Sequence, residues 1–141
     1  MKVCIKKLHE AAIVPKYSKP GDAGLDLTAT EIIKEEGFQI TYGTGLAVEI
    51  PLGYVGLIFP RSSIRNYELA LTNCVGVVDS GYRGEIQFKF NKIGGVPSKK
   101  YDVGDRIGQL IILPYPQIEL EEVSELSSTE RGDGGFGSSG K

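Results

Sequence analysis

The segment "EIQFKFN" (residues 85–91) carries the clearest strand pattern in the chain. Its large apolar residues, Ile86, Phe88 and Phe90, are separated by single polar residues. Because side chains alternate between the two faces of a β-strand, this period of two directs one face to a core and the other to water. The segment therefore predicts a half-buried strand, and the number of similar segments decides the fold.

Seven further short runs predict strands, separated by glycine, proline or aspartate. They are "KVCIKKL" (2–8), "GLDLTAT" (24–30), "GFQITY" (37–42), "GLAVEI" (45–50), "YVGLIF" (54–59), "IGQLIIL" (107–113) and "IELEEV" (118–123). The 19 glycines and 7 prolines are spread along the chain, which favours many tight turns. We expect an all-β domain, a jelly-roll-like sandwich or barrel. Its one helix would be a turn or two within "SSIRNYE" (62–68), capped by a serine.

Length and composition narrow the functional classes. A chain of 141 residues fits one domain. Its formal net charge of -2 lacks the positive excess that stable nucleic-acid binding requires. No apolar run approaches the roughly 18 residues of a membrane span. Cys4 and Cys74 are too few for a disulfide framework and are expected as partly buried thiols in a reducing compartment, the cytoplasm.

The inventory of side chains restricts the chemistry. His9 is the chain's one histidine and lies in a charged segment, where a solvated surface position is its ordinary reading. Without clustered histidines and cysteines the sequence predicts no zinc-type site and allows a hard cation held by oxygens. Acid-base catalysis would therefore use a carboxylate.

The strongest catalytic candidate lies in "NCVGVVDSGYRGE" (73–85). An apolar run there leads to Asp79, followed by a Ser-Gly turn and Tyr82, so that a hairpin could aim both side chains into one pocket. The alternative is an aspartate that caps a β-turn.

Two other segments offer groups for an anion. "FPRSS" (59–63) places Arg61, Ser62 and Ser63 where a strand ends, giving a guanidinium fork and hydroxyls for phosphate oxygens. "DRIGQL" (105–110) includes Gln109, which could equally be an outward residue of an ordinary strand.

Asp26 stands between two leucines in "AGLDL" (23–27). If both leucines face the core, Asp26 faces the other way, as a surface residue or as support for the water shell of a metal.

The glycine-rich end "RGDGGFGSSG" (131–140) lacks the Lys-Ser/Thr of a phosphate-binding P-loop. Its composition favours a disordered end, yet Arg131 and Phe136 are unusual in such a tail. Two alternatives stay open here: a disordered end, or a lid that becomes ordered over something bound.

Taken together and in this order, "AGLDL", "PRSS", "NCVGVVDSGYRGE", "RIGQL" and "RGDGGFGSSG" resemble the five motifs of the trimeric dUTP pyrophosphatase (dUTPase) family. The resemblance spans residues 23–140. It implies a dUTPase-like β-clip fold, a homotrimer with active sites shared between subunits, and Mg²⁺-assisted hydrolysis of dUTP to dUMP and pyrophosphate. That activity would limit uracil incorporation into DNA and supply dUMP for thymidylate synthesis.

The resemblance also implies roles for the hairpin residues. Asp79 would activate the water that attacks the α-phosphorus, and the Tyr82 ring would exclude a 2'-hydroxyl. Asn73 and the hairpin at Gly76 and Val78 would bind uracil and reject a 5-methyl group.

The phosphate and metal roles follow in the same way. Arg61, Ser62, Ser63 and Gln109 match phosphate-contacting positions, and Asp26 would assist Mg²⁺ indirectly, through water.

Residues 1–129 would form the β domain and residues 130–141 the flexible tail closing over the site. In this tail Phe136 would stack on uracil and Arg131 would reach the γ-phosphate. Gly137, Ser138 and Ser139 would cover the phosphates.

The sequence departs from the family pattern at Gly81, where many members have Asp, and at Ser63, which replaces a frequent glycine. Two other functions stay open at this point. One is a dCTP deaminase of the same fold, and the other is a non-catalytic module that binds a nucleotide or a protein.

Overall fold

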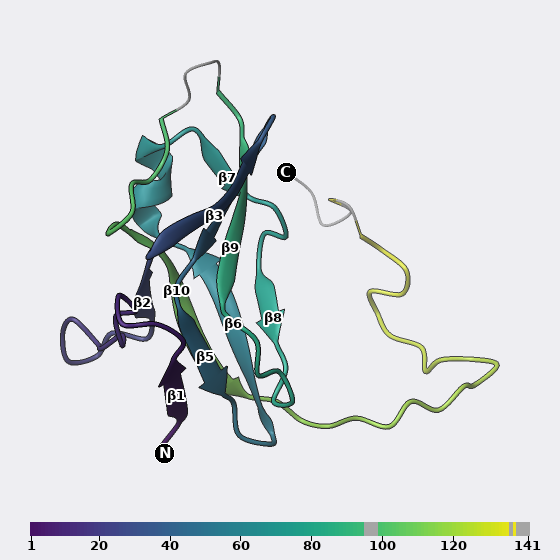
Figure 1. The fold of residues 1–141 in the computed structure, drawn as a ribbon. Coiled ribbons are helices and arrows are strands. Elements are labelled where there is room, and N and C mark those ends of the chain that lie inside the picture. The colour runs from purple at the N-terminus through teal and green to yellow at the C-terminus, as the bar shows by residue number, and fades with distance from the viewer. Residues whose placement is uncertain (95–98, 136, 138–141) are drawn as a thin grey trace.

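The computed structural model describes residues 1–94, 99–135 and 137, and within them the regular secondary structure is almost entirely β-strand (Figure 1). The elements are β1 (Cys4–Lys7), β2 (Leu25–Thr28), β3 (Glu31–Glu36), β4 (Gln39–Gly43), β5 (Leu46–Glu49), β6 (Tyr54–Pro60), the 3-10 helix η1 (Ser62–Asn66), β7 (Leu69–Leu71), β8 (Gly76–Val78), β9 (Gln87–Lys92) and β10 (Arg106–Pro114).

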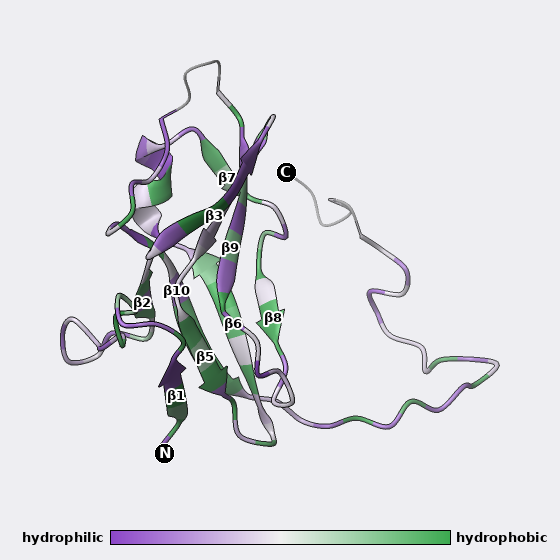
Figure 2. Ribbon diagram, viewed as in Figure 1, coloured by the Kyte–Doolittle hydropathy of each residue, from purple (hydrophilic) through white to green (hydrophobic). Residues whose placement is uncertain are grey.

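The strands form two antiparallel four-stranded sheets and a two-stranded pair. One sheet has the order β2-β10-β6-β8, the other has the order β3-β4-β9-β7, and β1 pairs with β5. The predicted all-β sandwich architecture is confirmed. Apolar residues are concentrated along β5 and β6, whereas β3 is largely hydrophilic (Figure 2).

The core contains the residues that the opening pattern predicts. Phe88 and Phe90 on β9 are fully buried and Ile86 is 3% exposed. Around them lie Tyr42 and Tyr101, and the Tyr42 hydroxyl donates a hydrogen bond of 2.8 Å to the Tyr101 carbonyl. Burial raises the pKa of Tyr42, so this phenol stays protonated as a donor.

Gly108 is required by the packing between the sheets. A Cβ at this position would overlap the Phe88 ring and lie 2.9 Å from the Phe59 carbonyl oxygen. Both neighbours are held in the sandwich, so neither can yield cheaply.

We expect Gly108→Ala to lower the free energy of unfolding by about 1–3 kcal/mol, because overpacking shifts side chains and backbone. Urea denaturation measures the change. Gly81→Ala is the matched control, because a Cβ at Gly81 meets nothing within 4 Å. Equal stability of the two variants would show that the core accepts the added methyl group.

Several sequence predictions differ from the structure. The segment 118–123 forms no strand: Ile118 and Leu120 are 73% and 87% exposed, and an alternating segment needs a neighbouring strand to pair with. The sequence did not single out β3, β7 or β8 as strands. The first is exposed along its whole length and the other two have three residues each.

The helix prediction is right in place and wrong in detail. The element is the 3-10 turn η1, its N-cap is Arg61 instead of a serine, and that cap makes no side-chain hydrogen bond. The expected partial burial of the two thiols is also wrong, because both Cys4 and Cys74 are exposed. Within the described ranges, no helix has the length and apolar character needed to cross a membrane.

Candidate active site

The two candidate carboxylates lie at opposite edges of the sheet β2-β10-β6-β8. Asp26 is on β2 and pairs with Gln109, which pairs with Phe59 on β6. Asp79 directly follows β8, at the other edge and further along the strands. From the usual spacing of strands and residues, the two carboxylates are roughly 20 Å apart.

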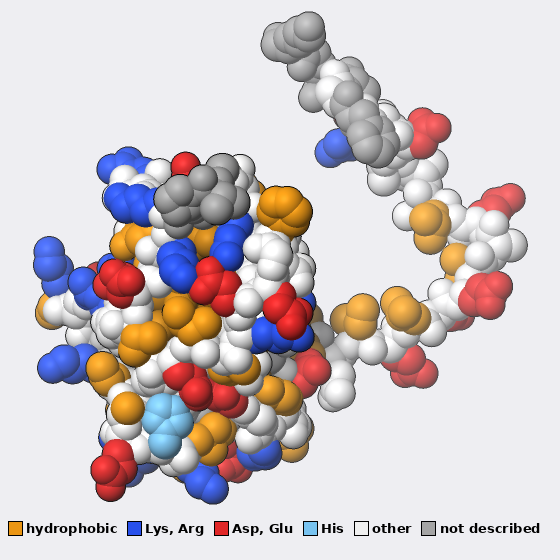
Figure 3. All heavy atoms as spheres, turned by 45° about the horizontal axis from the view of Figure 1, so that its top comes forward, with side chains coloured by type: hydrophobic (Ala, Val, Ile, Leu, Met, Phe, Trp, Pro, Cys, Tyr) orange, Lys and Arg blue, Asp and Glu red, His pale blue; other side chains and the backbone are white. Residues whose placement is uncertain are grey.

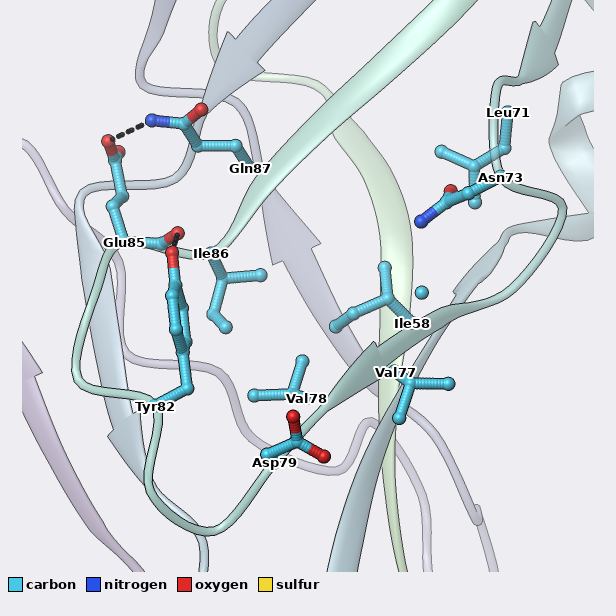
Figure 4. A pocket seen from close by; sticks show the side chains of 11 residues that line it. Ile58, Leu71, Asn73, Val77, Val78, Asp79, Tyr82, Glu85, Ile86 and Gln87 are labelled. Carbon is cyan, nitrogen blue, oxygen red and sulfur yellow. Dashed lines mark hydrogen bonds between the residues drawn. The ribbon is translucent and has the colours of Figure 1, made fainter.

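The hairpin residues gather around a pocket of about 240 Å³ (Figure 4). Its lining includes Asn73, Gly76, Val78, Asp79 and Tyr82, which are all the hairpin residues that the sequence predicts to bind substrate or act on it.

Apolar side chains separate the polar groups of this pocket. In Figure 4, Ile58 and Val78 lie between the Asn73 amide and the side chains of Asp79 and Tyr82. The Tyr82 hydroxyl donates to the Glu85 carbonyl at 2.9 Å, which fixes the ring as one wall. The pocket can therefore hold a flat polar ring and its sugar against apolar surface.

The Asp79 carboxylate is available for chemistry. The backbone closes the turn by a hydrogen bond of 3.1 Å from the Tyr82 N–H to the Asp79 carbonyl. Among the described residues, none hydrogen-bonds the Asp79 side chain. The capping alternative is therefore not supported.

Asp26 is the centre of a second cluster. Its Oδ1 accepts from Arg61 Nε at 2.9 Å and from Gln109 Nε2 at 3.0 Å, and its Oδ2 accepts from Arg106 at 2.9 Å. Arg61 also donates to the Ser63 hydroxyl at 3.3 Å. The sequence-predicted Arg61, Ser63, Gln109 and Asp26 are thus brought together.

This second cluster borders a pocket of about 510 Å³ whose lining carries more cationic than anionic side chains. Its charged side chains are three cations, Lys19, Arg61 and Arg106, and two anions, Asp22 and Asp26. The two guanidinium groups can each present further N–H donors to phosphate oxygens.

Sequence reasoning missed Arg106 as a site residue. Positions three apart lie on opposite faces of a regular strand, so Arg106 and Gln109 are not expected to share a partner. The register shifts between Arg106 and Gly108, and this irregularity returns Arg106 to the Asp26 side. The shift itself leaves no signal in the sequence.

Ser62 and the tail residues lie outside both clusters. Ser62 opens η1 and is exposed. Arg131 Nε donates to the Gly134 carbonyl at 2.9 Å, and Gly137 is exposed in the same tail. After β10 the chain loops outward beside the body of strands and then turns back (Figure 1). The predicted residues Phe136, Ser138 and Ser139 lie outside the described residues.

The fold and the two clusters define an all-β protein with a cationic pocket around Asp26 and a separate pocket that could hold a flat polar ring and a sugar. The dUTPase family model matches residues 10–140. Deoxyuridine 5'-triphosphate nucleotidohydrolase of Nautilia profundicola is 44% identical over 144 residues, covering 100% of both chains. That of Gloeobacter violaceus is 41% identical, covering 99% of this chain and 97% of the relative.

Solved structures agree with the sequence relatives. The Staphylococcus bacteriophage 80alpha dUTPase with dUpNHpp superposes with a TM-score of 0.86 at 30% identity, covering 99% of each chain. The chain belongs to the dUTPase family.

Proposed function

We propose that the protein hydrolyses dUTP to dUMP and pyrophosphate, and so limits uracil in DNA and supplies dUMP for thymidylate synthesis. Membership of the dUTPase family supports the substrate. The observation that carries the mechanism is the pairing of two pockets: a ring-and-sugar pocket lined by the Asp79 carboxylate, which no described residue hydrogen-bonds, and a cationic pocket around Asp26.

Asp79 acts as general base. It takes a proton from a water molecule as the water oxygen bonds to the α-phosphorus, and the bond from that phosphorus to the bridging oxygen breaks, releasing pyrophosphate. The unengaged side chain at the pocket edge supports this role.

The hairpin provides the selection for uracil. The Asn73 amide offers a donor and an acceptor, as a uracil edge requires. A Cβ at Gly76 would lie 3.1 Å from Ile58 and 3.3 Å from the Asn73 amide nitrogen. This narrowness supports rejection of a base that carries an additional methyl group.

The second cluster binds the phosphates. Arg61, Ser63 and Gln109, together with Ser62, donate to the phosphate oxygens, and Asp26 fixes the direction of the Arg61 and Gln109 side chains. Arg106 adds a further cation beside them.

The side chains around Asp26 are suited to hold Mg²⁺ through water molecules. Both Asp26 oxygens accept hydrogen bonds from guanidinium groups, Oδ1 from Arg61 and Oδ2 from Arg106, and these positive charges oppose direct ligation of a cation. This carboxylate therefore suits a role through water. Mg²⁺ prefers oxygen ligands and retains several waters, and when bound it neutralises charge that develops on the phosphates. Asp26 would orient one of those waters.

We infer that a complete site joins the two pockets from different copies in a homotrimer. The pockets share no lining residue and belong to opposite edges of one sheet. The outward face between them is apolar: it carries Val55, Leu57 and Phe59 on β6, Val77 on β8, and Ile111 and Leu113 on β10. Val77 is 65% exposed and Leu113 is 44% exposed, which suits burial against another copy.

Residues 130–141 form the closing tail of this proposal. Ordering a glycine-rich segment is costly, so it needs contacts made with ligand. Arg131 pairing with the γ-phosphate, Phe136 stacking on uracil, and Gly137, Ser138 and Ser139 over the phosphates would supply them. The two exposed thiols suit a reducing, cytoplasmic setting.

The function is tested by pyrophosphate release from dUTP, dTTP, dCTP and UTP, with Mg²⁺ and with a chelator. We expect release from dUTP with Mg²⁺, and a much lower kcat/KM for the other three. Ammonia release from dCTP would instead identify a deaminase, and binding without any product would identify a regulatory module.

Tyr82→Ala should narrow the preference for dUTP over UTP. The ring is held in place by the hydrogen bond to the Glu85 carbonyl and would occupy the space that a 2'-hydroxyl needs. The ratio of the two kcat/KM values measures the effect. Tyr82→Phe keeps the ring and serves as control, so an unchanged ratio in Tyr82→Ala would place discrimination elsewhere.

A further inference from the structure

Three potential metal ligands converge outside the cluster around Asp26. His9 lies after β1, Glu31 begins β3 and Glu85 precedes β9, and one ligand atom of each lies within 4.8 Å of the others. On the face shown in Figure 3, the imidazole is in the lower part of the body, with acidic side chains beside it.

Two glycines leave the space in which these side chains approach one another. A Cβ at Gly43 would lie 2.7 Å from Glu85 Oε1 and 3.1 Å from Glu31 Cγ. A Cβ at Gly45 would lie 2.6 Å from His9 Nε2. The three side chains can therefore approach one another only because Gly43 and Gly45 have no side chain, and any larger residue at either position would occupy that space.

Hydrogen bonds from the backbone and from one side chain hold two of the three ligands in place. The Gly45 N–H donates to Glu85 Oε1 at 2.7 Å, and Gln87 donates to Glu85 Oε2 at 3.0 Å. The Leu8 N–H donates to the Gly45 carbonyl at 2.8 Å, which fixes the segment carrying His9. The arrangement is thus formed before any ion binds.

The cluster has excess negative charge. His9 Nε2 lies 3.8 Å from Glu31 Oε1, close enough for attraction but beyond a hydrogen bond. One imidazole faces two carboxylates, so even a protonated ring leaves a negative charge uncompensated. A divalent cation would balance both carboxylates.

We propose that His9, Glu31 and Glu85 bind one first-row divalent cation of the Zn²⁺ type. Zn²⁺ accepts imidazole nitrogen together with carboxylate oxygen, and water completes its coordination, whereas Mg²⁺ prefers oxygen ligands alone. The sequence predicts no zinc-type site because the ligands are far apart along the chain and meet only in the fold.

The bound ion would be structural. Glu85 also borders the ring-and-sugar pocket, and its carbonyl accepts the Tyr82 hydroxyl. A cation here would fasten the base of the Asp79 hairpin to β3 and to the segment after β1.

Calorimetric titration of Zn²⁺ into the full, untagged chain tests the site. Cys4 and Cys74 are replaced by serine to remove competing thiols, and excess Mg²⁺ occupies sites for hard cations. We expect one Zn²⁺ per chain, with affinity lowered roughly tenfold or more in His9→Asn and in Glu31→Gln. Glu10→Gln, next to the cluster in sequence, is the matched control and should bind like the parent.

The chain's single imidazole gives a second readout by NMR. Its signals should shift on addition of Zn²⁺ and stay unchanged with Mg²⁺. Circular dichroism establishes that each variant is folded, and dUTP hydrolysis with Mg²⁺ should be unaffected in His9→Asn. The absence of stoichiometric binding, or equal binding by the parent and both ligand variants, would overturn the proposal.

Discussion

Asp79→Asn is expected to retain dUTP binding while kcat falls by roughly 10² to 10⁴, the usual contribution of a positioned base. The amide has nearly the same shape as the carboxylate but does not accept the proton from water. Because no described residue bonds the Asp79 side chain, the substitution removes no structural contact. Burst kinetics and equilibrium binding of a non-hydrolysable dUTP analogue separate the two effects.

The matched control is Asp102→Asn, an exposed carboxylate outside both pockets. It should keep full turnover. Near-normal kcat in Asp79→Asn would remove Asp79 from the role of general base.

Deletion of residues 130–141 should nearly abolish turnover while leaving the fold and the assembly intact. The described part of this tail is mostly exposed and bonds mainly within itself, for example through Arg131 and Gly134. Its removal therefore costs the empty protein little, whereas the substrate complex loses the proposed contacts to base and phosphate.

Circular dichroism, native mass and steady-state kinetics measure the three outcomes. A chain lacking only Lys141 is the control and should behave like the parent. Substantial turnover by the chain that ends at residue 129 would show that the pockets act without a lid.

The strands that sequence predicts best are those in which packing and pattern agree. Ile86, Phe88 and Phe90 alternate in the sequence and are buried in the structure. The same alternation at Ile118 and Leu120 predicts a strand wrongly. Alternation indicates that a segment could present one apolar face, but it does not indicate whether a neighbouring strand is there to pair with it.

The site could be predicted only in part. The motifs predict Asp79, Tyr82, Arg61 and Gln109 as candidates, but the separation of these residues into two pockets follows from strand order, which no single segment encodes. Arg106 reaches Asp26 because of a register shift that the residue spacing does not reveal.

The central claim is that one active site combines the Asp79 pocket of one subunit with the Arg61 pocket of another. Asp79→Asn and Arg61→Gln chains, each nearly inactive alone, are co-assembled in equal amounts, and mixed trimers are confirmed by native mass. With random assembly in a closed trimer, roughly a quarter of the sites contain both intact residues, and about a quarter of the parent kcat should return. If mixed trimers form and no activity returns, both residues act within one chain and the shared site is contradicted.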